Sequence, residues 1–350
     1  MTERYRAAIY GGSGFAGAEL IRRLLIHPHV ELVRVCSIDH VGEPLSVAHP
    51  HLEGVTNLTF EQLPAREAVR DVDIVLLGLP HTASIGVVES LLETPVKVLD
   101  MSGAFRLDDA AAYARYYGAT HPRPDLFARF AYGLPELNRA QIAQSRFVAS
   151  PGCFATTIEL ALLPLARAGL LRGAVDVVGI TGSSGSGVVP SPGTHHPVRA
   201  NNLRTYKPLD HQHVPEIERV LREASGKEVR VHFVPVSAPL VRGIFATAFA
   251  RVPAEHGEAA IQSLFQEAYA REPFVRVPAK RLPEVVAVSG SNYAEIGVTV
   301  GPVDGATRLV TVFGALDNLV KGGAGQAIQN MNLMLGVGER AALEDVGGYP

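Results

Sequence analysis

The chain has 350 residues, of which 47% are hydrophobic and 19% are charged, and its formal net charge is −3. This length predicts about two domains, and the composition excludes disordered, collagen-like and coiled-coil chains. The small net charge argues against bulk binding to nucleic acid or anionic membrane, and two cysteines exclude a disulfide framework.

Strands and helices alternate along the first 150 residues. Short apolar runs predict strands at residues 7–10, 30–38, 72–79, 96–100 and 147–149, and a helix at residues 18–26. Continuous apolar runs are typical of parallel strands covered on both faces. Residues 1–150 are therefore predicted to form a Rossmann-like, doubly wound parallel sheet, giving an α/β fold class.

After Pro151 the pattern changes to apolar and polar alternation, which is typical of antiparallel sheets with one exposed face. Strands are expected at residues 175–181, 229–236, 244–251, 296–300 and 308–312, and helices at 154–168, 213–224 and 259–270. The tail has a helical pattern over residues 319–335. We predict a second, α+β domain with a mostly antiparallel sheet. With no signal-peptide pattern and no apolar run near the ~20 residues of a membrane helix, a soluble cytoplasmic protein is expected.

A glycine-rich turn follows the first predicted strand, in the sequence IYGGSGFAGAE. Gly11, Gly14 and Gly17 lie between a strand and a helix, where glycines allow backbone to approach a pyrophosphate. The spacing GxxGxxG departs from the strict dinucleotide fingerprint, and a turn without ligand is the alternative. We interpret the turn as a cofactor site.

The second strand ends with residues that bear on the type of dinucleotide. An acidic residue there binds a ribose 2′-hydroxyl, whereas a basic one accepts a 2′-phosphate. Asp39 indicates NAD, and Ser37 and His40 are candidates for contacting the 2′-phosphate of NADP.

Cys153 follows Pro151 and Gly152 at the start of a predicted helix. Helix N-termini stabilise thiolates, which are the reactive form, so Cys153 is the candidate nucleophile. A proton donor or acceptor is available in His211 or His213, just before a helix. HxH and HH pairs also suit a metal, but no companion ligand pattern accompanies them, so we predict no metal site.

Two further segments are candidates for binding anions. The run TGSSGSGV at residues 181–188 offers backbone N–H groups and hydroxyls, including those of Ser183, Gly185 and Ser186. Arg106 follows a predicted parallel strand and is a candidate carboxylate or phosphate clamp. Arg199, Arg204 and Lys207, near the histidines, are further candidates.

Several motifs together resemble those of the N-acetyl-γ-glutamyl-phosphate reductases of arginine biosynthesis. The sequence is equally similar to their relatives in lysine biosynthesis, which act on aminoadipyl phosphate linked to a small acidic carrier protein. The similar stretches are GGSGFAGAEL (11–20), HPHLEG (49–54), LGLPH (77–81), FRL (105–107), YGLPELNR (132–139), PGCFAT (151–156), HQHVPEIE (211–218) and DNLVKGGAGQAIQNMN (317–332).

The resemblance implies a cytoplasmic acyl-phosphate reductase. Cys153 would displace phosphate to form a thioester, and hydride from NADPH would release a semialdehyde. His211 would be the catalytic histidine, with His213 and Tyr206 beside it. NADP(H) would be held by Gly11, Ser13, Gly14, Phe15, Ala16, Gly17, Ser37, His40, Pro80 and Asn318. Asp39 leaves NAD as the alternative.

The resemblance also implies a domain organisation: an NADP-binding domain over 1–150, a catalytic and dimerisation domain over 151–316, and a tail over 317–350 that returns to the first domain. A dimer or tetramer is expected. Differences from the arginine enzymes, including Ser150, Val188 and HHPVR at 195–199, leave the carrier-linked substrate as the alternative to N-acetyl-γ-glutamyl phosphate. A non-catalytic nucleotide-sensing protein is the third interpretation.

Overall fold

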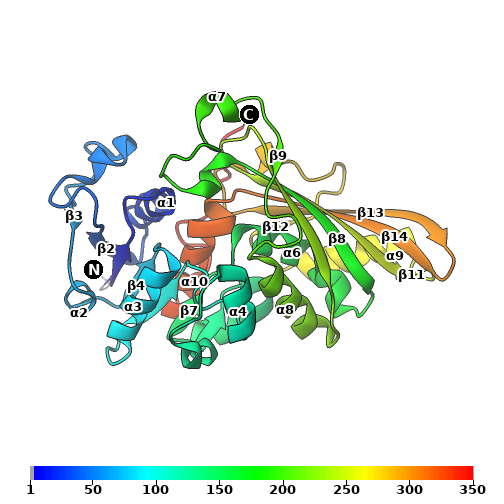
Figure 1. Cartoon of the computed structure of the whole chain (residues 1–350), viewed down its shortest axis with the longest axis horizontal. Helices are drawn as coiled ribbons and strands as arrows, with labels where there is room; N and C mark the ends of the chain where they lie inside the picture. The colour runs from blue at the N-terminus through cyan, green and yellow to red at the C-terminus, as the bar shows by residue number, and fades with distance from the viewer. Residues whose placement is uncertain (1–3, 350) are drawn as a thin grey trace. The chain divides into compact units, whose positions relative to one another are not determined.

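The computed structural model describes residues 4–349, which form two compact units. Unit 1 comprises the chain up to residue 111, residues 120–152 and residues 323–345. Unit 2 comprises residues 112–119, residues 153–322 and the chain from residue 346. Figure 1 shows the helices and strands of both units and labels many of them. Among residues 4–349, no helix has both the length and the apolar character needed to cross a membrane.

Unit 1 is built on a seven-stranded sheet in which every pairing is parallel. The strands, in the order β3-β2-β1-β4-β5-β7-β6, are β1 (Tyr5–Tyr10), β2 (Val30–Cys36), β3 (Phe60–Glu61), β4 (Ile74–Leu77), β5 (Lys97–Asp100), β6 (Phe130–Tyr132) and β7 (Phe147–Ala149). All four residues of β4 are buried, as its apolar run predicts. The strand order changes direction between β1 and β4, and ligands of such sheets bind at the carboxyl ends there.

The helices of unit 1 are α1 (Phe15–Leu24), α2 (Ala65–Ala68), α3 (His81–Leu91), α5 (Pro135–Gln144) and α10 (Gly325–Leu335); α4 (Ala110–Tyr117) begins in unit 1 and ends in unit 2. α10 packs against α5 and β5 although it comes from the end of the chain. Asn330 Nδ2 donates to the carbonyl oxygen of Gly133 at 2.8 Å, which fixes this contact. A side chain at position 133 would collide with Asn330, so glycine is required there.

Unit 2 contains a mixed seven-stranded sheet in the order β12-β13-β14-β11-β8-β10-β9. Its strands are β8 (Arg172–Thr181), β9 (Arg204–Thr205), β10 (Val231–Ser237), β11 (Ile244–Pro253), β12 (Val275–Arg276), β13 (Ala294–Asp304) and β14 (Thr307–Leu316). Only the β12–β13 and β8–β10 pairs are parallel. Ala246, Ala248 and Ala250 are buried whereas Phe249 between them is 40% exposed, so the sheet has one covered face.

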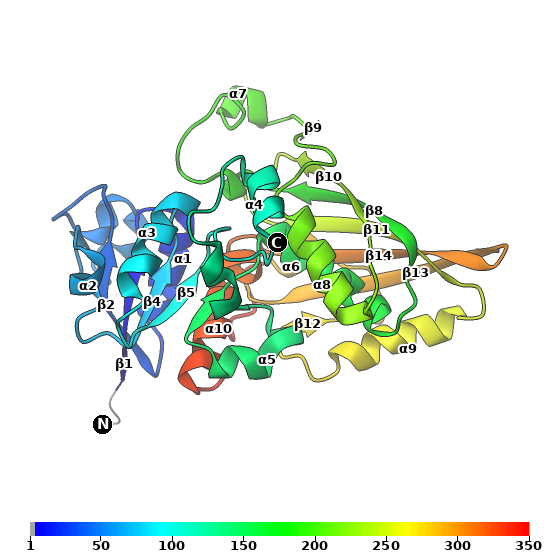
Figure 2. The same cartoon turned by 60° about the horizontal axis from the view of Figure 1, so that its bottom comes forward.

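The covered face carries three helices, α6 (Cys153–Arg167), α8 (Val214–Ser225) and α9 (Glu258–Tyr269); α7 (His196–Arg199) is a single turn. α6 contacts β11 and β14 and has α8 and α9 beside it (Figure 2). Residues 154–166 of α6 are all buried, so this helix is the core of unit 2. Its position fixes the backbone at Cys153, its first residue.

The predicted fold class is confirmed, with one parallel sheet and one mostly antiparallel sheet. The short strands β3, β6, β9 and β12 were not predicted, because two or three residues are too few to show a periodic pattern. The helix expected from residue 319 begins only at Gly325, after a π-type turn over Val320–Ala324. Gly323 interrupts it with φ −158° and ψ −110°, outside the helical region.

Candidate active site

The glycine turn connects β1 to α1 at the carboxyl edge of the parallel sheet. Gly11 has φ +81°, and a Cβ there would lie 2.2 Å from the carbonyl oxygen of Gly78. A Cβ on Gly17 would lie 2.4 Å from the carbonyl oxygen of Gly12. Glycine is therefore obligatory at both positions. α1 begins after Gly14 with no side-chain cap and no acidic residue in its first turn. The turn fits a dinucleotide pyrophosphate, because the helix N-terminus offers backbone donors and positive potential.

Other residues predicted to bind the cofactor lie around this turn. Ser13 and Ser37 are hydrogen-bonded through their hydroxyl oxygens at 3.0 Å. His40 has a left-handed backbone and places Nδ1 3.2 Å from Glu43 Oε2. Phe15 and Ala16 form the first turn of α1, and Pro80 precedes α3. The turn is held from behind by His49, which donates from Nε2 to the Gly12 carbonyl at 2.7 Å, a contact that sequence reasoning missed.

Cys153 is the first residue of α6, as predicted, and its side chain is partly exposed. A Cβ on residue 322 would lie 2.8 Å from Cys153 Cβ, so Gly322 allows the chain to pass closely over the cysteine. Tyr206 lies near the thiol: burial raises the pKa of its phenol above the ordinary value, and the charge of Cys153 raises it further.

His211 and His213 lie in the same cluster as Tyr206. The ring of His211 is 5.8 Å from that of Tyr206, 4.6 Å from that of His213 and 5.7 Å from that of Phe154. His213 caps α8. Cys153, Tyr206 and the two histidines are thus brought together in unit 2. Within residues 4–349, no three His, Cys, Asp or Glu side chains converge as metal ligands would.

The protonation state of His211 follows from its surroundings. Burial, and to a smaller extent the charge of the nearby Lys207, lowers the pKa of His211 to about 4. The backbone N–H of His213 donates to His211 Nδ1 at 3.2 Å. Nδ1 is therefore the unprotonated nitrogen, and the neutral imidazole carries its proton on Nε2.

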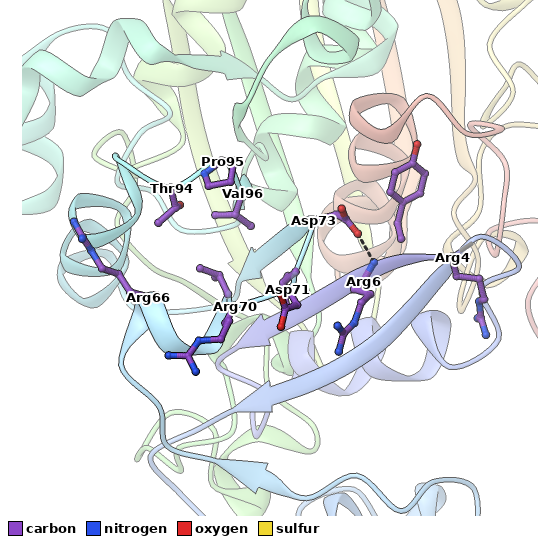
Figure 3. Close-up of a pocket in the computed structure, with 12 residues that line it drawn as sticks. Arg4, Arg6, Arg66, Arg70, Asp71, Asp73, Thr94, Pro95 and Val96 are labelled. Carbon is purple, nitrogen blue, oxygen red and sulfur yellow. Dashed lines mark hydrogen bonds between the residues drawn. The ribbon is translucent and has the colours of Figure 1, made fainter. Parts of the chain in front are cut away.

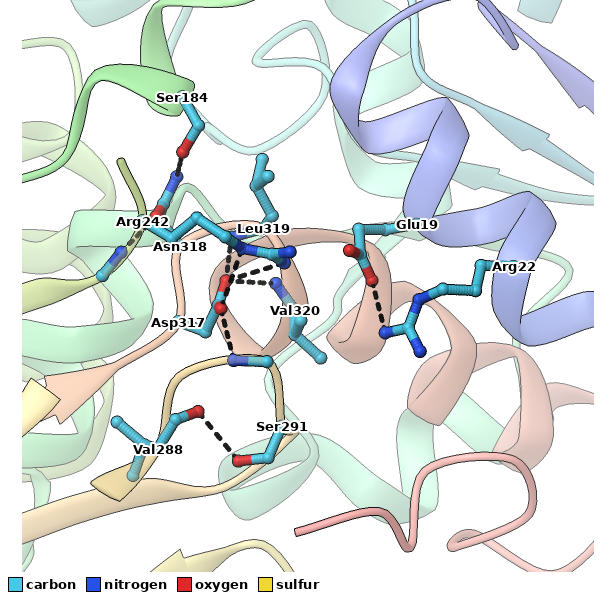
Figure 4. Close-up of polar contacts among 12 residues, drawn as sticks. Glu19, Arg22, Ser184, Arg242, Val288, Ser291, Asp317, Asn318, Leu319 and Val320 are labelled. Atoms are coloured by element: carbon cyan, nitrogen blue, oxygen red, sulfur yellow. Dashed lines mark hydrogen bonds and ion pairs between the residues drawn. The ribbon is translucent and has the colours of Figure 1, made fainter. Parts of the chain in front are cut away.

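The serine-rich segment forms a 3₁₀ turn over Ser183–Ser186. The backbone N–H groups of Ser183 and Ser184 donate to the carbonyls of Leu240 and Val241, so these two donors are unavailable to an anion. Asn318 supports this turn: its Nδ2 donates to Ser184 Oγ at 3.0 Å, and its Oδ1 accepts from Gly243 N–H at 2.7 Å (Figure 4).

The neighbouring Asp317 organises the segment that covers Cys153. Its buried carboxylate accepts hydrogen bonds from the backbone of Gly290, Leu319 and Val320. It also forms an ion pair with Arg242 at 3.0 Å (Figure 4). These bonds fix the start of the turn that leads to Gly322.

Two of the arginines predicted to bind anions differ in their surroundings. Arg106, in unit 1, donates to the carbonyls of Ser150 and Met101 at 2.8 and 2.6 Å, so it braces the chain at the ends of β5 and β7. Arg199, in unit 2, is only 8% exposed, yet its Nε and Nη2 have no hydrogen-bond partner among residues 4–349. Burial lowers its pKa, and the adjacent Arg204 lowers it further. An unsatisfied buried guanidinium is a strong candidate for binding an anion.

A cavity of about 890 Å³ in unit 1 lies at the amino ends of the strands, opposite the edge that carries the glycine turn. It is lined by arginines and aspartates, including Arg4, Arg6, Arg66, Arg70, Asp71 and Asp73 (Figure 3). Arg4 donates to the carbonyls of His27 and Val30, and Arg66 to that of Ser90. Because it lies at the opposite edge of the sheet from the glycine turn, this cavity is not part of the candidate site.

The family comparison accounts for both units. Residues 6–145 match the semialdehyde dehydrogenase NAD binding domain, and residues 153–318 match the semialdehyde dehydrogenase dimerisation domain. The chain belongs to the semialdehyde dehydrogenase family. It is thus an oxidoreductase of a family that binds a nicotinamide dinucleotide through its N-terminal domain.

Relatives that match this chain over nearly its whole length confirm the resemblance found in the motifs. An N-acetyl-gamma-glutamyl-phosphate reductase of Methanopyrus kandleri is 43% identical, over 98% of each chain. A putative [LysW]-L-2-aminoadipate 6-phosphate reductase of Thermomicrobium roseum is 42% identical over 98% of each chain. A [LysW]-L-2-aminoadipate 6-phosphate reductase of Deinococcus radiodurans is 40% identical over 100% of this chain and 99% of its own.

Solved structures support the fold. Aspartate semialdehyde dehydrogenase II of Vibrio cholerae superimposes with a TM-score of 0.71 at 16% identity, covering 95% of this chain and 99% of its own. The aspartate semialdehyde dehydrogenase of Candida albicans, solved with NADP, gives 0.70 at 13% identity over 95% and 99%.

Proposed function

We propose that this enzyme reduces the side-chain acyl phosphate of an acidic amino acid to a semialdehyde through a thioester on Cys153. The observation that carries the proposal is the cluster of Cys153, Tyr206 and His211 in unit 2. Cys153 stands at the N-terminus of a buried fifteen-residue helix, where a thiolate is stabilised. A nucleophilic thiol must stay reduced, and the cytoplasm is a reducing compartment, so we place the reaction there.

The sulfur of Cys153 attacks the acyl carbon, a carbon–sulfur bond forms, and the bond to phosphate breaks with release of inorganic phosphate. The nicotinamide dinucleotide supplies the hydride for the reduction. When the carbon–sulfur bond breaks, the electron pair returns to sulfur and the semialdehyde leaves. Negative charge builds on the acyl oxygen in both stages, so a hydrogen-bond donor near Cys153 accelerates both.

His211 serves as that donor in our proposal. The proton of the neutral ring is on Nε2, because Nδ1 accepts the His213 N–H. With its pKa lowered to about 4 by burial, the ring is neutral at pH 7. A neutral Nε2–H stabilises a developing oxyanion, whereas it has no lone pair with which to remove the proton of the thiol.

We further propose that Arg199 binds an anionic group of the substrate. Its buried, unsatisfied nitrogens lack a counter-charge, and an acyl phosphate or the released phosphate supplies one. Tyr206 links it to the cluster, because the pKa of this phenol responds to both Cys153 and Arg199. Replacing Arg199 by methionine should raise the KM for phosphate in the reverse reaction by ~10²-fold, the scale of a charged hydrogen-bonded contact. The matched control is Arg204→Met, which removes an exposed neighbour.

N-acetyl-γ-glutamyl phosphate is the first substrate candidate. The second is an aminoadipyl or glutamyl phosphate linked to an acidic carrier protein, and the Thermomicrobium roseum and Deinococcus radiodurans relatives favour it through their names. Exposed Arg204 and Lys207, near Tyr206 in sequence, offer charge complementary to such a carrier.

The open face of the unit 2 sheet suits self-association. Val178, Thr247 and Phe313 lie side by side across β8, β11 and β14, and Phe249 follows on the same face of β11. Val178 and Phe249 are 38% and 40% exposed. We propose that two copies of the chain pair through this face, as expected for a dimerisation domain.

The decisive assay follows phosphate-dependent reduction of NAD⁺ and NADP⁺ in the reverse direction. N-acetylglutamate semialdehyde and an aminoadipate semialdehyde derivative are offered free and carrier-linked. Turnover of the free acetylated substrate assigns the first candidate, and activity only with the carrier-linked one assigns the second. Cys153→Ala should abolish turnover while dinucleotide binding is retained; activity surviving in this variant would exclude the thioester.

A further inference from the structure

The segment after β2 is fixed against the glycine turn of unit 1. The backbone N–H groups of Gly11 and Gly12 both donate to the carbonyl of Cys36, at 3.0 and 3.1 Å. Ser37, the next residue, is only 7% exposed, and its own N–H donates to the Glu61 carbonyl in β3. Residues 37–39 thus hold a defined position beside the turn expected to bind the dinucleotide.

The hydroxyl groups at this position form a chain of hydrogen bonds that ends on Asp39. Ser37 Oγ donates to Ser13 Oγ at 3.0 Å, and Ser13 Oγ donates to Asp39 Oδ2 at 3.4 Å. Ser37 Oγ also accepts from the Asp39 N–H at 3.0 Å. Both serine hydroxyl groups therefore donate their protons within this chain. What remains for a ligand is the Asp39 carboxylate, which can only accept hydrogen bonds.

The charge of the same segment is negative. Residues 37–43 contain Asp39 and Glu43 and no lysine or arginine. His40 is directed to Glu43, with 3.2 Å between Nδ1 and Oε2. Arg34 of β2 donates instead to the carbonyls of Ala68 and Arg70. A 2′-phosphate, with a charge of about −2, would meet no lysine or arginine of this segment, and the one histidine is already directed to Glu43.

We propose that Asp39 makes this enzyme prefer NADH, whose adenosine ribose has a free 2′-hydroxyl, over NADPH. A carboxylate accepts hydrogen bonds from ribose hydroxyls and repels a phosphate, and the Ser37–Ser13–Asp39 chain offers no proton to a phosphate oxygen. The inference rests on the proposed function, because it concerns the dinucleotide that this family binds through its N-terminal domain.

Binding of each dinucleotide to the intact protein tests the proposal without reference to turnover. Isothermal titration calorimetry with NADH and NADPH should give a dissociation constant at least ~10-fold lower for NADH, since like charges brought together are strongly unfavourable. Asp39→Asn keeps the size of the side chain and removes its charge, so it should erase most of this ratio. The double variant Ile38→Arg with Asp39→Ser should reverse it.

The matched control is Asp71→Asn, which removes an exposed carboxylate from the opposite edge of the same sheet. The NADH to NADPH ratio should not change in this variant. Equal or tighter binding of NADPH by the unmodified protein overturns the inference, as does an unchanged ratio in Asp39→Asn. Failure of both dinucleotides to bind would instead overturn the proposed function itself.

Discussion

Acidification should destabilise this protein through His211, and the size of the effect follows from its burial. The ring is 3% exposed, and its pKa is lowered to about 4, chiefly by burial and then by Lys207. An unfolded histidine titrates near pH 6.5. As the pH falls from about 6.5 to 4, the unfolded chain binds a proton that folded His211 does not bind. Stability from this group is therefore complete above pH 7 and is lost toward pH 4.

The expected loss is about 2 kcal/mol between pH 7 and pH 5 and about 3 kcal/mol when the pH is below 4. Urea unfolding of the protein and of His211→Asn, at pH 7 and pH 5, measures it. Asparagine does not titrate, and its Oδ1 can accept the His213 N–H in place of Nδ1. The variant should lose about 2 kcal/mol less than the parent on acidification, because only the His211 contribution is removed.

Comparing the pH dependence, rather than stability at one pH, cancels any packing defect of the variant. His196→Asn is the control, since His196 is exposed. It should lose stability on acidification to the same extent as the parent protein. An equal loss in the parent and in His211→Asn would show that folded His211 titrates normally, and would remove the basis for treating its ring as neutral at pH 7.

Three further substitutions test other parts of the structure. His211→Ala should lower kcat by ~10²–10³-fold, because it removes the proposed oxyanion donor. His211→Gln places an N–H donor near the position of Nε2 and should retain far more activity. Equal losses in the two variants would argue against an oxyanion donor at this position. Gly179→Ala would put a Cβ 2.6 Å from the Phe154 ring and should lower the free energy of unfolding, measured in urea, by ~1–3 kcal/mol. The control is Gly86→Ala, at an open position on α3, which should leave this free energy unchanged or raise it. Phe249→Asp should convert the proposed dimer to a monomer in sedimentation velocity, and an unchanged sedimentation coefficient would refute the proposed interface.

The sequence predicted the features that depend on neighbouring residues. A glycine turn after an apolar run identified the connection from β1 to α1, and Pro-Gly before Cys153 identified the first residue of α6. Both signals are local, because turn conformation and helix initiation are decided within a few residues. The combination of motifs was also sufficient to identify the family.

Other functional properties depend on atoms far apart in the chain. The sequence showed Arg199 as one of several arginines, and only the fold buries it without a partner. Ser183 and Ser184 are suitable donors by sequence, but the loop between β10 and β11 packs against their turn, and their N–H groups donate to the carbonyls of residues 240 and 241.

By itself, the sequence predicted the fold class and the reaction family, and it singled out Cys153 as the candidate nucleophile, because these signals come from local patterns. The tertiary structure decided the tautomer of His211 and the end point of the Ser37–Ser13–Asp39 chain. Burial and hydrogen-bond direction set those two properties, and both arise only when segments distant in sequence pack together.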